Sequence, residues 1–212
     1  MITIEQARSY YHDNDTAHGF DHVLRVLHLA ERIGAAEGAD SAILRPAVLL
    51  HDVARAEAHV TGECHAQLGA IRAMELLHGQ PEEQVARIAQ VIREHRFRDD
   101  LKPSSIEAKV LYDADKLDAI GAVGIARAYA VAGLMKQKLW AKVNDDYAER
   151  SKQEAANDLH ADEHTPAHEF KFKLVKLKDT LFTETGRGIA EERHNFAVAF
   201  FDRLAAEVAG QL

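Results

Sequence analysis

The chain has 212 residues, of which 47% are hydrophobic, so it is long enough for one domain with a sizeable core. Its net charge of -8 argues against general nucleic-acid binding, because that function needs a basic surface to replace phosphate counterions. No run approaches the ~20 apolar residues of a membrane span, and the segment Met1–Glu5 does not resemble a signal peptide. The single cysteine, Cys64, permits no internal disulfide, which suits a reducing cytoplasm, and a cytoplasmic location is expected.

The 3.6-residue periodicity of a helix recurs along the chain, and no segment alternates as a half-buried strand does. An all-α fold is therefore expected. Each of the four prolines can lie at a helix start or between helices. The predicted helices cover, in chain order, residues 3–12, 18–37, 41–57, 64–78, 82–96, 105–120, 121–134, 144–159, 166–183 and 186–210.

One segment differs in composition from the rest. Residues 135–163 are more polar than their surroundings and contain Asn144-Asp145-Asp146. This segment is predicted to be an exposed cap or a mobile lid within a single domain that spans residues 1–212.

Three predicted helices place ligand-type side chains where the pattern predicts burial. His22 shares an apolar helical face with Val26, and Asp115 lies on such a face of a later helix. His51 and Asp52 directly follow an all-apolar run. A buried imidazole or carboxylate is costly unless it is paired or bound to a cation, so these four residues are candidate metal ligands.

Two imidazoles and two carboxylates suit one divalent ion, and Mn, Fe, Co, Ni, Zn and Mg all remain candidates. Such a ligand set leaves coordination positions open for water and substrate, as a hydrolytic metal requires. Each residue alone has a simpler interpretation. A histidine on an apolar face is more often a satisfied core histidine, and an aspartate there can cap a helix or pair with an arginine.

Taken in order, these residues resemble the HD-domain superfamily of metal-dependent phosphohydrolases, whose signature is a His, then a His-Asp pair, then a distant Asp. The surroundings resemble a branch of small bacterial HD hydrolases, and the similarity spans roughly residues 10–205. The segments that carry it are His18–Val26, Leu49–Asp52, Asp113–Gly121, Gly124–Arg127, Lys173–Leu177 and Thr183–Arg187.

The resemblance implies an all-α HD-domain helical bundle in which His22, His51, Asp52 and Asp115 bind one metal ion. Members of this branch resemble nucleotide phosphohydrolases, and some convert nucleoside triphosphates to the monophosphate and pyrophosphate. The expected partner is therefore a small phosphorylated substrate of nucleotide type, with no nucleic acid and no membrane. The sequence leaves the oligomeric state open, and a homodimer is compatible with it.

Metal-activated water is expected to attack a phosphorus atom. The candidate catalytic residues are Asp52, Asp118 and Lys116, for phosphate contact and for orienting water or a ligand. Alternatively, Asp118 pairs with Lys116 or Arg127. Arg55 occupies the position where some HD nucleotidases have a glutamate that orients the water, so the general base is either Asp118 or Asp52, or the metal acts without one.

Several basic or titratable side chains could contact the substrate. Helical spacing places His18 and Arg25 on the face of His22, although Arg25 could instead pair with Asp21 or Glu31. The full set of predicted substrate-binding residues is His18, Arg25, His65, His95, Lys116, Lys173 and Lys176.

The other members of this set have alternative interpretations. His65 and His95 could line the cleft or could cap helix ends. Lys173 and Lys176 could bring positive charge to a polyphosphate or could belong to a solvated basic face.

Two hypotheses compete with the enzyme. One is an HD module that senses a nucleotide with slow or no turnover. The other is a helical protein in which the metal is a structural staple, which the two imidazoles argue against because calcium and magnesium staples use oxygen ligands.

Overall fold

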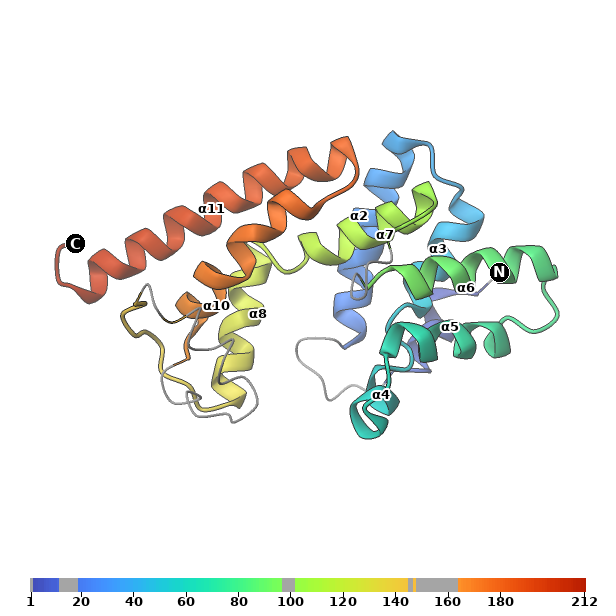
Figure 1. Ribbon diagram of the computed structural model, residues 1–212, viewed down its shortest axis with the longest axis horizontal. Helices are drawn as coiled ribbons and strands as arrows, with labels where there is room; N and C mark the ends of the chain where they lie inside the picture. The colour runs from blue at the N-terminus through green and yellow to red at the C-terminus, as the bar shows by residue number, and fades with distance from the viewer. Residues whose placement is uncertain (1, 12–18, 97–101, 145–146, 148–163) are drawn as a thin grey trace. The chain divides into compact units, whose positions relative to one another are not determined.

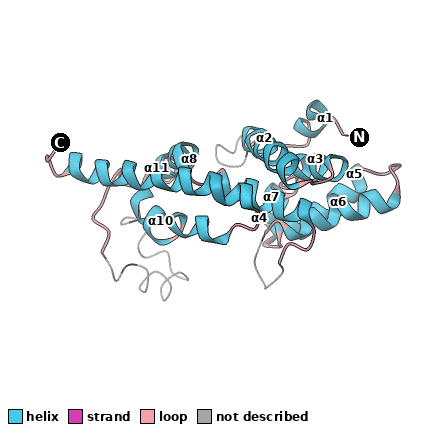
Figure 2. Ribbon diagram, turned by 90° about the horizontal axis from the view of Figure 1, so that it is seen from above, coloured by secondary structure: helices cyan, strands magenta, loops and turns pink. Residues whose placement is uncertain are grey.

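A computed structural model describes residues 2–11, 19–96, 102–144, 147 and 164–212 of the protein (Figure 1). Every regular element among these residues is helical, which confirms the all-α prediction (Figure 2). The elements are α1 (Ile4–Arg8), α2 (Phe20–Glu37), α3 (Ser41–Leu50), α4 (Arg55–Thr61), α5 (His65–Leu76), α6 (Glu82–Glu94), α7 (Ile106–Leu117), α8 (Gly121–Leu134), α10 (Pro166–Phe172), the 3-10 helix η1 (Leu174–Thr180) and α11 (Glu184–Val208).

The chain divides into two compact units. The first contains Met1–Asp118 and Leu181–Gly188, and the second contains Ala119–Thr180 and Ile189–Leu212. The expectation of one domain over residues 1–212 with a cap stays a prediction. Most of the proposed cap, and most of the helix predicted over residues 144–159, lies outside the described residues.

The first unit is built around α2, which packs against α3 and α7, while α3 also packs against α6 (Figure 1). The pair α5 and α6 lies side by side, and α4 packs against α5. The apolar face predicted for α2 is the buried one, as amphipathic periodicity requires. The buried residues of this face include His22, Val26, Leu29 and Ile33.

The helix predicted over residues 41–57 is wrong in one respect, because α3 ends at Leu50 and α4 begins at Arg55. Side chains bond the carbonyls of the last turn. His51 Nδ1 donates to the Val48 carbonyl over 2.7 Å, and the Tyr11 hydroxyl donates to the Leu49 carbonyl over 2.9 Å. Helix termini leave such carbonyls unsatisfied, so these side-chain donors stabilise the break. Because of the break, His51 and Asp52 lie in the turn between α3 and α4 and not within one continuous helix.

Pro46 lies inside α3, and not at a helix start or between helices as the sequence suggests. Proline has no backbone N–H, so the carbonyl four residues earlier loses its helical donor. That carbonyl belongs to Ala42 and accepts from the Gln84 side-chain amide of α6 over 3.1 Å. A side chain of the neighbouring helix therefore replaces the missing donor.

Asp113, fully buried in α7, connects the late segment Leu181–Gly188 to the first unit. Its carboxylate accepts from the backbone N–H groups of Phe182 and Thr183, at 2.9 and 2.8 Å, and from the Thr183 hydroxyl. The Thr183 oxygen in turn accepts from the N–H of Gly186 over 3.0 Å, which caps α11. A Cβ at Gly186 would lie 2.6 Å from the Asp113 carboxylate, so the segment needs glycine there.

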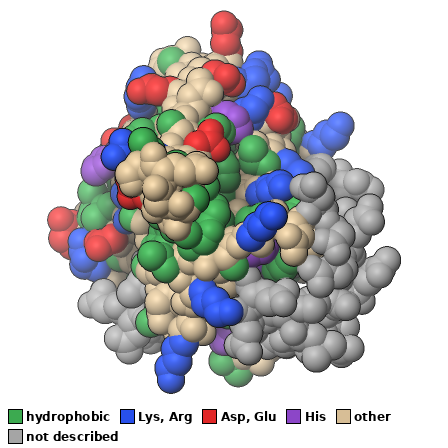
Figure 3. Space-filling model, turned by 90° about the vertical axis from the view of Figure 1, so that its left-hand side faces the viewer, with side chains coloured by type: hydrophobic (Ala, Val, Ile, Leu, Met, Phe, Trp, Pro, Cys, Tyr) green, Lys and Arg blue, Asp and Glu red, His purple; other side chains and the backbone are tan. Residues whose placement is uncertain are grey.

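The second unit has its own apolar core, formed where α8, α10 and α11 supply Ile125, Ala167, Ala197 and Phe201. Hydrophobic side chains gather near the middle of the face that Figure 3 shows, with acidic and basic side chains around them. The large apolar side chains of this unit that are exposed are Leu134, Met135, Leu139, Phe196, Val208 and Leu212.

Within the part of the chain that the structure describes, no single helix has both the length and the apolar composition of a membrane span. Only α7 and α8 together, as a bent pair, meet those two criteria. Most side chains of α7 are buried inside the first unit, and buried core helices pass the same test.

Candidate metal centre

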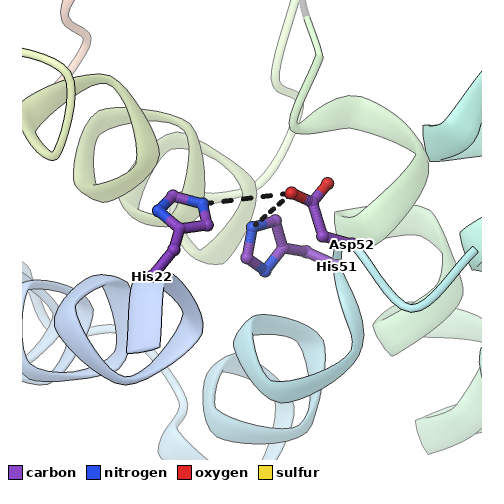
Figure 4. Close-up of side chains that lie close together, drawn as sticks. All are labelled: His22, His51 and Asp52. Atoms are coloured by element: carbon purple, nitrogen blue, oxygen red, sulfur yellow. Dashed lines mark ion pairs between the residues drawn. The ribbon is translucent and has the colours of Figure 1, made fainter. Parts of the chain in front are cut away.

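Three buried side chains of the first unit point toward one another and form the candidate metal centre (Figure 4). His22 comes from α2, and His51 and Asp52 come from the turn after α3. The Oδ2 atom of Asp52 lies 3.7 Å from Nε2 of His51 and 3.9 Å from Nε2 of His22. All three side chains are buried, and their potential ligand atoms lie within 4.8 Å of one another, so this group could hold a metal ion.

Asp115 completes the set of four predicted ligands. It lies in α7, and its Oδ1 atom is 3.3 Å from Nε2 of His22. Burial opposes ionisation of Asp115, but the charge of the neighbouring Lys116 outweighs burial and holds the pKa of Asp115 well below its usual value. The fourth ligand position is therefore an ionised carboxylate at neutral pH.

The hydrogen bonds of His51 fix which ring nitrogen faces the centre. Its Nδ1 donates to the Val48 carbonyl, so Nε2 carries a lone pair and no proton. This Nε2 atom is fully buried and has no hydrogen-bond partner among the described residues. A buried acceptor without a donor is costly, and a bound cation would satisfy it. The residues present therefore fit a divalent ion.

His22 is oriented by a carboxylate. Its Nδ1 lies 2.7 Å from Oδ2 of Asp118, so that nitrogen donates and Nε2 faces Asp52 and Asp115. Asp118 also accepts from Arg25, through Nε at 2.8 Å and Nη2 at 3.0 Å. Carboxylate partners of this kind hold metal-binding imidazoles in one tautomer and one orientation.

A second group shares Asp52. Its Oδ1 atom lies 3.5 Å from Nε2 of His65 and 3.8 Å from Nε2 of His95, and this group too has the spacing of a metal site. Burial lowers the pKa of His95 to about 3 and that of His65 to about 4, so both rings are neutral at neutral pH. Asp52 thus presents one oxygen to each group.

Each carboxylate of the centre also has a basic side chain beside it. These pairs join Nη1 of Arg55 to Oδ2 of Asp52 at 3.2 Å, Nζ of Lys116 to Oδ2 of Asp115 at 2.7 Å, and Nε of Arg25 to Oδ1 of Asp118 at 2.8 Å. Burial would raise the pKa of Asp52, but the positive charge around it, that of Arg55 included, holds it far below its ordinary value. Each of these buried or partly buried carboxylates therefore has a cationic partner that favours its ionised form.

Comparison with known proteins identifies the family. The model of the HD domain matches residues 19–120. The YpgQ protein of Bacillus subtilis is 35% identical over 202 residues, which cover 93% of this chain and 88% of YpgQ. The chain belongs to the HD family. It is an HD superfamily hydrolase, and members of this superfamily are metal-dependent phosphohydrolases.

Solved structures support the same assignment. YpgQ in complex with ADP is 31% identical, with a TM-score of 0.73, over 99% of this chain and 100% of YpgQ. A predicted HD superfamily hydrolase from an uncultured Thermotogales bacterium is also 31% identical, with a TM-score of 0.66, over 96% of this chain and 90% of its own. An HD-superfamily hydrolase from Bacillus thuringiensis is 27% identical, with a TM-score of 0.70, over 98% and 97%.

The remaining predicted residues of this HD hydrolase divide by location. Arg25 pairs with Asp118 and not with either alternative partner that the sequence suggested. Lys116 donates to Asp115, and its Nζ lies 5.0 Å from the centre of the Tyr112 ring. Arg25 and Lys116 therefore both lie at the candidate metal centre. Their contact with a phosphate stays a prediction.

Three further residues are predicted to contact the substrate. His18 lies outside the described residues. Lys173 and Lys176 belong to the second unit, where Nζ of Lys173 lies 2.6 Å from Oε1 of Glu169. The predicted roles of all three in substrate binding stay predictions.

Two residues around this HD centre have no signal in the sequence. Tyr11 reaches the turn of His51 through its hydrogen bond to Leu49, and Arg96 donates to Nδ1 of His65 over 3.1 Å. Each hydrogen bond joins positions more than thirty residues apart, at separations of 38 and 31 residues. Helical periodicity relates residues within one element and does not report such contacts.

Proposed function

We propose that this protein hydrolyses a nucleotide, with a nucleoside triphosphate cleaved to the monophosphate and pyrophosphate, using one divalent metal ion. The observation that carries the proposal is the buried, unpartnered Nε2 of His51 facing the Asp52 carboxylate. The nucleotide class is supported by the similar YpgQ protein, which was solved with ADP. The proposed metal ligands are His22, His51, Asp52 and Asp115.

A bound divalent ion would make water more acidic and withdraw charge from a phosphoryl oxygen. The protein contributes the geometry. Asp118 holds the His22 ring in place, and Arg25 holds Asp118 through two hydrogen bonds. Lys116 is the proposed cation for a phosphate oxygen, since it lies beside Asp115 at the partly exposed side of the centre.

The overall reaction balances without a further reactant. The oxygen of water bonds to the α-phosphorus, and the bond from that phosphorus to its bridging oxygen breaks. Pyrophosphate leaves with the electron pair, and the protons of the water are released or taken up by the leaving oxygen.

The contacts of Asp118 favour a positioning role over that of a general base, because its two oxygens already accept from His22 and Arg25. Asp52 is a weak base, since neighbouring charges hold its pKa far below the ordinary value despite burial. We therefore propose that no strongly basic side chain replaces the glutamate that some relatives have at the position of Arg55.

Replacement of His51 or Asp52 by alanine tests the proposal. Either change removes a ligand, and metal-dependent phosphate release from nucleoside triphosphates is expected to fall by about a thousandfold or more. The exposed His28 on α2 provides the matched control, and His28→Ala should keep full activity. Far-UV circular dichroism should show near-native helicity in every variant.

Survival of activity in both the His51 and Asp52 variants would show that the site is wrong. A screen of divalent metals against nucleoside mono-, di- and triphosphates, with the products identified, would define the substrate. Tight nucleotide binding without any product in that screen would instead indicate a sensor module.

A further inference from the structure

Two arginines lie beside the group formed by Asp52, His65 and His95. Nη1 of Arg55 lies 3.2 Å from one oxygen of Asp52 and 3.4 Å from the other. Nη1 of Arg96 donates to Nδ1 of His65 over 3.1 Å. Neither arginine belongs to the residues proposed above as ligands or catalytic groups, and both are positively charged at any working pH.

The hydrogen bonds assign the protons on the two rings. His95 Nδ1 donates to the Ile92 carbonyl, so its Nε2 is an acceptor. His65 accepts from Arg96 at Nδ1, so its proton is on Nε2, which lies 3.3 Å from Nε2 of His95 and 3.5 Å from Asp52. A metal ligand must direct a lone pair at the ion. His65 directs an N–H group into this space, which suits an anion.

The charges around this group also favour an anion over a second divalent cation. A second divalent cation here would share the single carboxylate of Asp52 with Arg55, and it would lie near Arg96. Like charges at short range in a partly buried site repel strongly. A phosphoryl group would instead accept hydrogen bonds from both guanidinium groups, whose planar forks match phosphate oxygens.

We infer that Arg55, Arg96 and His65 form a subsite for a phosphoryl group beside Asp52, and that the centre holds one divalent ion per chain. The identity of this group as part of the substrate rests on the proposed function. Once an ion occupies the group of His22 and His51, it offsets the charge of Asp52. The two arginines are then available to the phosphoryl oxygens.

The first test is the metal count. The protein is dialysed to equilibrium against Mn²⁺, and bound manganese per chain is measured by elemental analysis. One ion is expected, and two would overturn the inference. Arg55→Glu removes the competing cation and adds a carboxylate, so this variant is expected to bind a second Mn²⁺. A count that stays at one in Arg55→Glu would contradict the charge argument.

The second test is anion binding, measured by calorimetric titration of inorganic phosphate into the Mn²⁺-loaded protein. Arg96→Ala should weaken phosphate binding on the order of tenfold or more, because a charge-assisted donor is lost, while the metal count stays unchanged. The exposed Arg93, in the last turn of α6 and three residues before Arg96, provides the control, and Arg93→Ala should bind phosphate as the native protein does. Equal phosphate affinity in the Arg96→Ala variant and the native protein would overturn the inference.

A second variant distinguishes a loss of phosphate binding from a failure to fold. If Arg96→Ala does not fold, Arg55→Ala is titrated in its place, with the same expected loss of phosphate affinity and the same contradicting result. Neither readout uses nucleotide turnover. A chain that binds phosphate in this way but cleaves no nucleotide would retain the subsite and refute the proposed function.

Discussion

A chain of three side chains, Arg25, Asp118 and His22, determines the geometry of one proposed ligand. The guanidinium group of Arg25 makes two hydrogen bonds to Asp118, and Asp118 holds Nδ1 of His22 at 2.7 Å. Because Asp118 is buried, removal of its charge would leave both neighbours with a weaker partner in a site of low polarity. The carboxylate would therefore act on a bound metal ion through the imidazole.

Asp118→Asn tests this role. The amide is nearly isosteric but can present its NH₂ group to His22 and lacks the charge, so Mn²⁺ affinity is expected to fall by roughly 10- to 100-fold. Calorimetric titration of Mn²⁺ measures the loss. The control is Asp21→Asn at an exposed position of α2. An unchanged Mn²⁺ affinity in Asp118→Asn would show that Asp118 does not orient His22.

At this scale the sequence predicts ligand types but not their orientation. His22 and Asp115 could be recognised because each is a polar side chain on an apolar helical face, and the resemblance to the HD family selected Asp115 over its neighbours. The partner of Arg25 could not be recognised, because Asp118 lies 93 residues away in the chain. Only the packing of α2 against α7 brings them together.

Among the elements, α5 lies unusually close to the turn that carries two of the proposed ligands. A Cβ placed on Gly69 would lie 3.1 Å from the backbone oxygen of His51 and 3.4 Å from Cγ2 of Ile92. The absence of a side chain at this position lets α5 approach the end of α3. The close approach also positions His65, the first residue of α5, beside Asp52.

Gly69→Ala is therefore expected to destabilise the protein by about 1–3 kcal/mol, since the new methyl group meets a backbone oxygen that cannot rotate away. Gly188→Ala in α11 is the matched control. A Cβ there meets nothing within 4 Å, and the change should stabilise the helix by about 0.5–1 kcal/mol through its better helix propensity. Urea unfolding of both variants measures the difference. Equal stability of the two variants would contradict the close approach.

Helix boundaries show where sequence prediction stops working. Most predicted helices match observed ones to within a few residues, but residues 41–57 form two helices and residues 166–183 form α10 followed by η1. Apolar periodicity continues through the break after Leu50, so it predicts one helix. The break depends on donors from His51 and Tyr11, and the second of these is a tertiary contact.

For the whole molecule, buried neutral histidines make stability depend on pH. Burial lowers the pKa of His95 from 6.5 to about 3 and that of His65 from 6.5 to about 4. Below pH 6.5 the unfolded chain therefore binds protons that the folded chain does not, and the free energy of unfolding falls as pH falls. The window runs from the unfolded pKa of 6.5 down to the folded values, and only its upper part, above about pH 5, lies clear of the range in which carboxylates titrate.

Metal-free protein is expected to lose about 2 kcal/mol of unfolding free energy through His95 alone between about pH 7 and pH 5. Urea unfolding in the presence of a chelator measures this change. His95→Gln removes the titrating ring, and its stability should depend less on pH over the same interval. The same pH slope in the variant and the native protein would contradict the assigned cause.

The hydrogen bonds that Asp113 accepts from Phe182 and Thr183 have a consequence for folding during synthesis on the ribosome. A nascent chain that has reached residue 118 contains all four proposed metal ligands. It lacks the hydrogen-bond donors for Asp113, because Thr183 lies 70 residues after Asp113 in the chain. The intervening residues, 119–180, belong to the second unit. Since domains tend to fold as units during synthesis, the ribosome must release most of the second unit before the first can close around its buried carboxylate. A prematurely terminated chain would therefore carry the ligands without a completed fold to hold them.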